Sequence, residues 1–521
     1  MAPFKVGSID VKMRDTSRPQ AAPATARNTV LPAGHKKRPD CRALVSPVIF
    51  DQNQILTLRD GTTIRVDIFR PVGDQKVPAV VMWGPYGKSG TGLLNLHSMP
   101  LRAGIPADRL SGYEDFEGLD PAEWVPRGYA IVNIDPRGVA IAPLEGLSDP
   151  FREDCFRGGI PWTTFARSIA DVLPGRQQQE DLGAMVDPYT ITNDYLEDKR
   201  ADFSEIQVPV YIGASYSSDL HCIGSLRAFE EIPHPNKWLV LHSTQEWYDL
   251  YWEDRTQDLD KFFSYYLKDT RNNWPLTSPV RLALLNYTKP PIINREFSDL
   301  PWQLPSAVSS RLYLRPDCKL SGQKPLVQSG ILHFQADTAE EIAFTFDVPS
   351  KMTIVGPSTL VIHASAPDHD DLDIYTHVFK ADKEGNILSN LNIPTPDGLP
   401  AEEQAKLTEN TVFRYWGPNG ILRSSRRHVS TEKSGKTWKT LSYERIEKVQ
   451  PGEVVRLEIQ LWPTGIVFEA GEKLVLKICG EKLGVPSLPH LLKEPNQNRG
   501  KHALYVGGQW ESYLQFFTTG I

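Results

Sequence analysis

Several features are scarce in this chain, and each scarcity argues against a class of protein. The five cysteines are scattered and form no C-x-x-C pair, which argues against a disulfide framework and against a zinc site. No stretch approaches the ~20 apolar residues that a membrane-spanning helix needs. The net charge is −7 with acidic and basic residues intermixed, so the positive field typical of a nucleic-acid binder is missing.

Cofactor and targeting motifs are missing as well. The chain has no glycine-rich phosphate loop and no dinucleotide-binding fingerprint. Residues 1–27 are polar, with no apolar core of a signal peptide, and we interpret residues 1–44 as a disordered tail. The expectation is therefore a cytoplasmic protein with no cofactor, no bound metal, no nucleic-acid partner and no membrane partner.

The first part of the chain alternates short apolar strands with helical patterns. A length of 521 residues suggests two or three domains. A hairpin is expected around Asp60-Gly61, which supplies its turn. Buried strands are expected at 77–83, 129–134, 206–212 and 238–241, and helices at 224–231 and 259–267. This alternation indicates an α/β fold with a helix-covered parallel sheet.

The pattern changes after about Pro301. From there the chain consists of short β-rich segments separated by Gly, Pro and Asp turns, such as Pro451-Gly452 and Ala470-Gly471. Many short strands at moderate spacing indicate a β-sandwich or jelly roll.

Motifs in a particular order carry a resemblance to a known family. They are Asp60-Gly61-Thr62, Arg70-Pro71, Pro85-Tyr86-Gly87-Lys88, Gly128-Tyr129-Ala130, Asp135-Pro136-Arg137-Gly138, Val208-Pro209, Asp219, Gly224-Ser225-Leu226-Arg227 and Lys237-Trp238-Leu239-Val240. Together they resemble the cocaine-esterase and X-Pro dipeptidyl-peptidase family, and Gly471-Glu472-Lys473-Leu474 resembles part of its jelly-roll domain. The resemblance covers most of residues 45–521.

The resemblance implies an α/β-hydrolase sheet with a helical lid, followed by a C-terminal β-sandwich (jelly roll). The hydrolase domain would occupy residues 45–148 and 206–300, the lid 149–205, and the sandwich 301–521. The analogy also suggests association into homo-oligomers through the sandwich.

The implied chemistry is that of a serine hydrolase acting on a small-molecule ester or amide, or on a peptide. A serine attacks the acyl carbonyl, a histidine takes its proton, and an aspartate orients the histidine. By resemblance, Asp219 matches the triad acid, and Tyr86 matches the tyrosine whose hydroxyl helps form the oxyanion hole.

One piece of the family pattern is missing. After Arg137-Gly138-Val139 the family continues through a helix and a strand that ends in the nucleophile serine, but here Ala140-Ile141-Ala142-Pro143 follows at once. We therefore expect this chain to be an inactive or weakened member of the family. The alternative is a non-catalytic pseudo-hydrolase that binds a small molecule or a protein through aromatic residues such as Trp162, Trp247, Tyr248, Tyr251 and Trp252.

Two triad positions have competing interpretations. Glu246 stands where the family histidine is expected, and His242, four residues earlier, is either a half-buried structural histidine or the catalytic one. Ser215, within Gly213-Ala214-Ser215-Tyr216-Ser217, nearly fits G-x-S-x-G, but Ser217 replaces the second glycine. Because Asp219 follows Ser215 by only four residues, the spacing favours a loop serine over a nucleophile.

Two acidic groups have functional and structural interpretations. The cluster Asp368-His369-Asp370-Asp371 with Asp373 could coordinate a hard cation, but a solvated turn before a strand is the favoured interpretation. Glu145 and Asp149 could form an acid–base pair, and the resemblance favours surface or capping roles for them.

Overall fold

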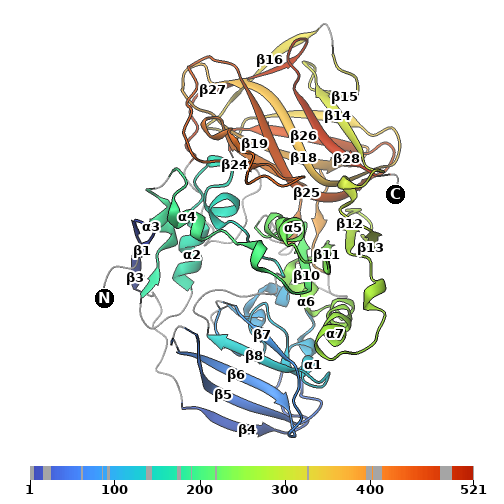
Figure 1. The fold of residues 1–521 in the computed structure, drawn as a ribbon. Helices are drawn as coiled ribbons and strands as arrows, with labels where there is room; N and C mark the ends of the chain where they lie inside the picture. The colour runs from blue at the N-terminus through green and yellow to red at the C-terminus, as the bar shows by residue number, and fades with distance from the viewer. Residues whose placement is uncertain are drawn as a thin grey trace.

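The computed structural model describes residues 5–15, 25–59, 61, 63–84, 86–90, 94–135, 144–172, 178–188, 190–217, 220–325, 328–394, 402, 413–481 and 496–519. Figure 1 shows three regions one above another: an N-terminal sheet, a middle region of strands and helices, and a C-terminal β-rich region. This arrangement confirms the α/β-hydrolase architecture with a C-terminal β-sandwich. Among the described helices, none has the length and apolar character needed to cross a bilayer.

The N-terminal sheet has five strands in the order β4-β5-β6-β8-β7. Their bounds are β4 (Arg27–Leu31), β5 (Val48–Thr57), β6 (Thr63–Pro71), β7 (Ala79–Met82) and β8 (Ala130–Asp135). The predicted hairpin is confirmed, since β5 and β6 pair antiparallel with Thr57 opposite Thr63. The two apolar runs expected near 77–83 and 129–134 form β7 and β8, which pair in parallel.

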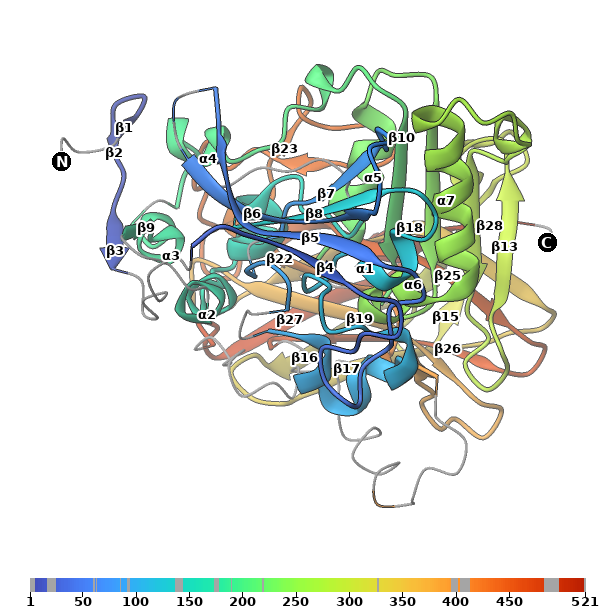
Figure 2. The ribbon, with the colours of Figure 1, turned by 90° about the horizontal axis from the view of Figure 1, so that it is seen from below.

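Ordered structure begins before the expected start at Val45. β4 pairs antiparallel with β5 along its whole length, and Cys41 and Leu44 are buried. Farther upstream, β3 (Met13–Asp15) pairs with β9 (Gln178–Glu180), and Figure 2 shows it beside α3 (Leu182–Val186). The disordered tail predicted for residues 1–44 is therefore wrong over these segments. Backbone pairing and buried side chains in them outweigh the polar composition on which the prediction rested.

The middle region contains a second sheet in the order β10-β11-β12-β13. The strands are β10 (Val210–Ser215), β11 (Lys237–His242), β12 (Val280–Leu284) and β13 (Ile292–Phe297), the first three parallel and the last antiparallel. The helices of this region are α5 (Cys222–Glu231), α6 (Glu246–Tyr251) and α7 (Glu253–Leu267), whereas α1 (Pro121–Trp124) lies beside β8 of the N-terminal sheet (Figure 1). In α7 the buried residues Arg255, Thr256, Leu259 and Phe262 recur at helical spacing and face the sheet.

The two sheets do not join within the described residues. No described strand pairs with the outer edge of β7, and the outer edge of β10 carries a single parallel bridge between Leu144 and Gly213. Ala79 and Val81 of β7 are exposed, Val81 by 49%. A strand inside a parallel sheet is normally buried on both faces, so β7 has the character of an edge strand.

The segment between the sheets, residues 149–205, is mostly helical. It contains η4 (Phe151–Cys155), η5 (Arg157–Gly159), α2 (Thr164–Val172), α3, α4 (Asp194–Asp198) and η6 (Phe203–Glu205). This composition agrees with a helical lid, but its role and the domain boundaries at 148, 205 and 300 remain predictions.

The C-terminal region is a β-sandwich. One sheet has the order β15-β14-β28-β18-β27-β16, with β25 also paired to β18, and the other has the order β17-β26-β19-β22. Their bounds are β14 (Val308–Leu314), β15 (Leu320–Ser321), β16 (Ser329–Gln335), β17 (Glu341–Asp347), β18 (Met352–Ser365), β19 (Asp373–Ala381), β22 (Asn419–Arg423), β25 (Val455–Phe468), β26 (Lys473–Cys479), β27 (Lys501–Gly507) and β28 (Tyr513–Thr518). The finer jelly-roll assignment remains a prediction.

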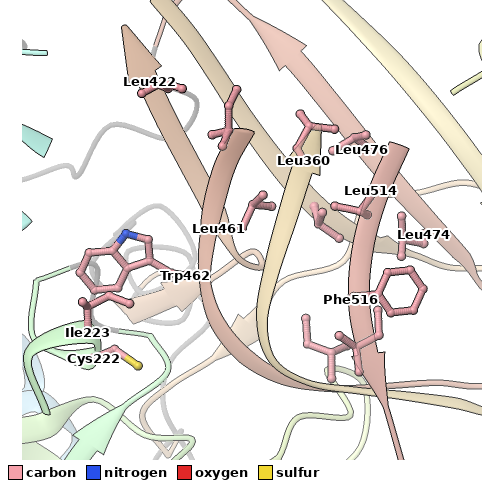
Figure 3. Packing of buried hydrophobic residues seen from close by; sticks show 14 of the residues in the cluster. Cys222, Ile223, Leu360, Leu422, Leu461, Trp462, Leu474, Leu476, Leu514 and Phe516 are labelled. Atoms are coloured by element: carbon pink, nitrogen blue, oxygen red, sulfur yellow. The ribbon is translucent and has the colours of Figure 1, made fainter. Parts of the chain in front are cut away.

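The sandwich and the second sheet share one hydrophobic core. Leu360, Leu461 and Leu476 of the sandwich belong to the same cluster of buried side chains as Ile212 of β10 and Leu239 of β11. Figure 3 shows Ile223 of α5 beside Trp462 of β25 at one end of this cluster. The sandwich therefore holds the second sheet in place from one side.

Candidate functional site

The candidate site lies at the carboxyl ends of β10 and β11. Ser215 and His242, the last residues of the two strands, are direct neighbours in the parallel register. On the other side of β10, the amide of Glu145 donates to the carbonyl of Gly213 at 3.0 Å. Ligands of α/β sheets typically bind at this edge. Segments far apart in the sequence thus bring Glu145, Ser215 and His242 to one place.

Ser215 is completely buried and its hydroxyl is engaged locally. Its Oγ donates to the carbonyl of Thr244 at 2.6 Å and lies 2.6 Å from the Oγ of Ser217. No hydrogen bond between Ser215 and His242 occurs among the described residues. These contacts tie the ends of β10 and β11 together, and they favour a structural serine over a nucleophile, although Ser215 ends strand β10 and does not lie in a loop.

His242 is buried, with hydrogen-bonding groups at both ring nitrogens. Nε2 lies 2.8 Å from Oε1 of Glu145, and Nδ1 lies 3.2 Å from Oγ1 of Thr244 and 3.6 Å from Oδ1 of Asp249. Asp249 is in turn paired with Arg255 at 2.6 Å. Burial alone would raise the pKa of Asp249, but the charges of Arg255 and His242 outweigh it and hold that pKa below its ordinary value.

Asp219, the predicted triad acid, lies outside the described residues, as does the Val139–Ala140 junction. His221, two positions after Asp219, is described. It precedes α5, and its Nδ1 lies 3.7 Å from Oε2 of Glu145. Burial lowers the pKa of His221, and the neighbouring Glu145 opposes that effect.

Tyr86, the predicted oxyanion-hole residue, has its hydroxyl hydrogen-bonded to the carboxyl of Glu117. Oε1 of the same carboxyl accepts a hydrogen bond from the indole nitrogen of Trp247 at 2.7 Å. Burial, together with the nearby Glu117 charge, raises the pKa of Tyr86 well above its ordinary value. The hydroxyl therefore stays protonated, as an oxyanion donor must be, but it is directed at Glu117.

Three carboxyl groups converge at the site. Burial raises the pKa of Glu117 to about 7, against the lowering effect of its hydrogen bonds. Burial also raises the pKa of Glu246 well above its ordinary value, and the charges of Glu145 and Glu117 add to the effect. Glu246, for which the resemblance predicts the position of the family histidine, begins α6 and lies with Glu145 and His221 in one group of side chains.

Two of these carboxylates sit on strained backbone. Glu117 has a φ of 63° and Glu145 a φ of 64°, both in the left-handed region that disfavours residues with a side chain. Such a conformation costs about 1–3 kcal/mol and is concentrated at functional sites. The strained backbone distinguishes these two glutamates from Glu246, the third carboxyl group of the site.

Sequence reasoning undervalued Glu145. A surface or capping role was favoured for Glu145 and Asp149, and it fits only Asp149, whose carboxylate accepts from the amide of Arg152 at 3.0 Å and pairs with its guanidinium. The Glu145 side chain is only 8% exposed and contacts His242. The available signal was its place directly after an apolar run, since a carboxylate at the end of a parallel strand points to the ligand-binding edge.

The acidic group near residue 370 is structural. Asp371 accepts hydrogen bonds from the hydroxyls of Ser424 and Ser425, both at 2.6 Å, and Asp373 pairs with Arg423 at 2.6 Å. These contacts support a turn before β19, as favoured, although Asp373 is buried and not solvated.

Two family models match the sequence. The X-Pro dipeptidyl-peptidase (S15 family) model matches residues 60–140, and the X-Pro dipeptidyl-peptidase C-terminal non-catalytic domain model matches residues 272–515. A search of curated proteins found no match.

Solved structures resemble the whole chain. A CocE/NonD family hydrolase from Staphylococcus aureus is 22% identical with a TM-score of 0.78, covering 100% of this chain and 99% of its own. An alpha-amino acid ester hydrolase is 14% identical with a TM-score of 0.61 and 99% coverage of both chains. An aminopeptidase from the marine sediment archaeon Thaumarchaeota archaeon is 12% identical with a TM-score of 0.60, covering 90% of this chain and 97% of its own. These likenesses concern the fold.

Proposed function

The chain belongs to the hydrolases of the X-Pro dipeptidyl-peptidase (S15) type, and from this premise we propose that it is a serine-type acyl hydrolase whose own activity is lost or severely weakened. The reaction of its active relatives would be the hydrolysis of an ester or amide bond in a small molecule or peptide. In that reaction a serine attacks the acyl carbonyl and a histidine carries the proton. Asp219 would orient the histidine, and Tyr86 would help to hold the oxyanion.

The observation that carries this proposal is the break between β7 and β10. The resemblance places the nucleophile strand and its helices between Val139 and Ala140, which along the chain lies between the end of β8 and the bridge of Leu144 to β10. Among the described residues, β7 has one exposed face and one unpaired edge. The loss of a neighbouring strand and its helix would leave a strand in this state. The S15 match also ends at residue 140.

The surroundings of Ser215 support the weakened activity. A nucleophilic serine needs access to substrate and a hydrogen bond to its base. Ser215 is buried, and its hydroxyl bonds to Thr244 and Ser217 while His242 contacts Glu145. Without a triad serine, only the modest residual catalysis of the oxyanion hole and of substrate binding would remain.

A fluorophosphonate probe tests the proposal, because it labels serines activated by a neighbouring base. The full chain should show no labelling above that of the Ser215→Ala variant, while an active serine hydrolase in the same tube is labelled. Stoichiometric labelling of Ser215, or of any other serine in the chain, would contradict the proposal.

Sequencing the expressed transcript across the codons for Val139 and Ala140 gives an independent test. An uninterrupted junction supports an inactive or weakened protein. An in-frame insert that encodes a strand and a serine elbow would instead assign the activity to a longer form, in which Tyr86 and Asp219 have their family roles.

A binding function is the second candidate, and a cavity between the lid and the sandwich favours it. The cavity has a volume of ≈ 80 Å³ and is lined by Trp438, Tyr443 and Trp462 together with Arg152 and Arg227. The aromatic side chains of this lining suit the apolar part of a small molecule, while the two arginines add positive charge at its border. Quenching of tryptophan fluorescence by apolar compounds, lost in Trp438→Ala, would support this candidate.

A further inference from the structure

We propose that Glu145, His221 and Glu246 bind one divalent transition-metal cation at the carboxyl-end edge of β10 and β11. This inference goes beyond the proposed function and does not depend on it, since it concerns binding and not ester or amide hydrolysis. The three side chains come from the segment that bridges to β10, from the start of α5 and from the start of α6.

The geometry of the three side chains suits a single ion. Each offers one ligand atom, and these atoms all lie within 4.8 Å of one another. In tetrahedral coordination, bonds of about 2.0–2.2 Å from a zinc ion to nitrogen and oxygen place any two ligand atoms roughly 3.4 Å apart. Rotamer adjustments on the order of 1 Å would therefore close the group around an ion.

An unsatisfied carboxylate oxygen points to a missing ligand. Oε2 of Glu145 is buried and accepts no hydrogen bond from the described residues. It faces His221, whose Nδ1 is 3.7 Å away, which is longer than a hydrogen bond. A buried acceptor without a hydrogen bond is unfavourable, more so if it is charged, and a cation would satisfy it.

The other carboxylate oxygen of Glu145, Oε1, is held in place by His242. Nε2 of His242 lies 2.8 Å from Oε1, and the opposite ring nitrogen faces Thr244 and Asp249. Metal-ligating side chains are typically oriented by such a second layer of hydrogen bonds. The chain through Asp249 to Arg255 therefore keeps Oε2 of Glu145 aimed at the proposed ion.

The number of carboxyl groups in the region also suits a cation. Glu117 acts electrostatically on Glu246, which adds a third carboxyl group to those of Glu145 and Glu246. Within the described part of the chain, no lysine or arginine forms an ion pair with any of the three. A mixed set of imidazole and carboxylate ligands suits ions such as Zn²⁺ and Mn²⁺.

A second group of ligand-type side chains provides the contrast. Asp40, Cys41 and His97 also lie within 4.8 Å of one another. Arg38 pairs with Asp40 at 3.5 Å, so a cation there would have to compete with a guanidinium. We therefore assign the ion to the Glu145 group and use His97→Ala as the matched control.

The experiment is a calorimetric titration of the full chain with Zn²⁺, and separately with Mn²⁺, after removal of metal by a chelator. We expect one ion per chain for at least one of the two metals. Affinity should fall at least tenfold in Glu145→Gln and in His221→Ala, and should be unchanged in His97→Ala.

Failure of both metals to bind would overturn the inference, as would unchanged affinity in both ligand variants or loss of binding in His97→Ala. Circular dichroism and the thermal midpoint in chelator show whether each variant is folded. If Glu145→Gln does not fold, Glu246→Gln takes its place with the same expected loss. Because no substrate or serine probe is involved, the titration can fail or succeed independently of the labelling experiment.

Discussion

The strands β7 and β10, which stand at the ends of the N-terminal sheet and of the second sheet, differ in what covers them. Every residue of β10 is buried, whereas the residues of β7 alternate between exposed and partly buried. Both are short apolar strands, so their composition does not explain the difference. What differs is the number of faces against which other side chains pack.

The second sheet is covered on both faces. Ile212 and Leu239 belong to the core shared with α5 and the sandwich, while Tyr211 and Val240, their neighbours in sequence, belong to the core shared with the N-terminal sheet. In β7, Val80 and Met82 pack against that second core, but Val81 is 49% exposed. Because side chains of a strand alternate between faces, the missing cover lies on one face of β7 only.

The largest expected effect comes from the strand with two covered faces. Leu239→Ala in β11 removes a completely buried side chain from the core shared with the sandwich. We expect the free energy of unfolding to fall by about 2–5 kcal/mol, since both the transfer of the side chain and the cavity contribute. Urea denaturation followed by circular dichroism measures this change, and a loss below about 1 kcal/mol would show that the sheet is less well packed than described.

A smaller effect, dependent on pH, should come from His502 in β27. Burial, with a contribution from His369, lowers the pKa of this imidazole from 6.5 to about 4. The unfolded chain therefore binds the proton more readily than the folded one. The corresponding stability is present above pH 6.5 and is lost as the pH falls from 6.5 toward 4, by about 3 kcal/mol in all.

Measuring unfolding at pH 7 and at pH 4.5 in parallel for the natural chain and His502→Phe checks this prediction. The variant should lose most of the extra pH dependence, because phenylalanine carries no proton. Because the second sheet and the sandwich share one hydrophobic core, both should unfold in the same transition. An unchanged pH dependence in the variant would assign the effect to other groups.

The smallest expected effect is on the strand with one uncovered face. Val81→Ala in β7 should change the free energy of unfolding by no more than about 0.5 kcal/mol, as is usual for a position exposed to solvent. It is the matched partner of Leu239→Ala and is measured in the same urea titration. A loss above about 2 kcal/mol would mean that the outer face of β7 is covered, and the proposed loss of its neighbour would have to be abandoned.

Element positions were predictable where the pattern is local. The helix expected at 259–267 is present as the later part of α7, which begins earlier, at Glu253. Its first turns carry the charged Glu253, Asp254 and Arg255, so the apolar pattern did not reveal them. Arg255 is nevertheless buried, because its guanidinium is paired with Asp249.

The candidate site was predictable only in part. Tyr86, Ser215 and His242 were chosen from motifs, and the last two do lie side by side at a strand edge. Glu145 and Glu117 were not chosen as site residues, and His221 was not singled out at all. No short motif contains them together, and their contacts depend on loops that return to the same edge from different elements.

Local patterns in the sequence were enough to predict the alternation of strands and helices and the change to a β-rich region, because hydrophobic periodicity and turn residues act over a few positions. The hydrolase family was identified separately, by the resemblance of motifs in a particular order. The contacts of His242 with Glu145, the burial of Ser215 and the one-sided cover of β7 follow from folding alone. They depend on which segments become neighbours at the end of the parallel sheet. This arrangement brings together residues far apart in the sequence, such as Glu145 and His242, which are 97 positions apart.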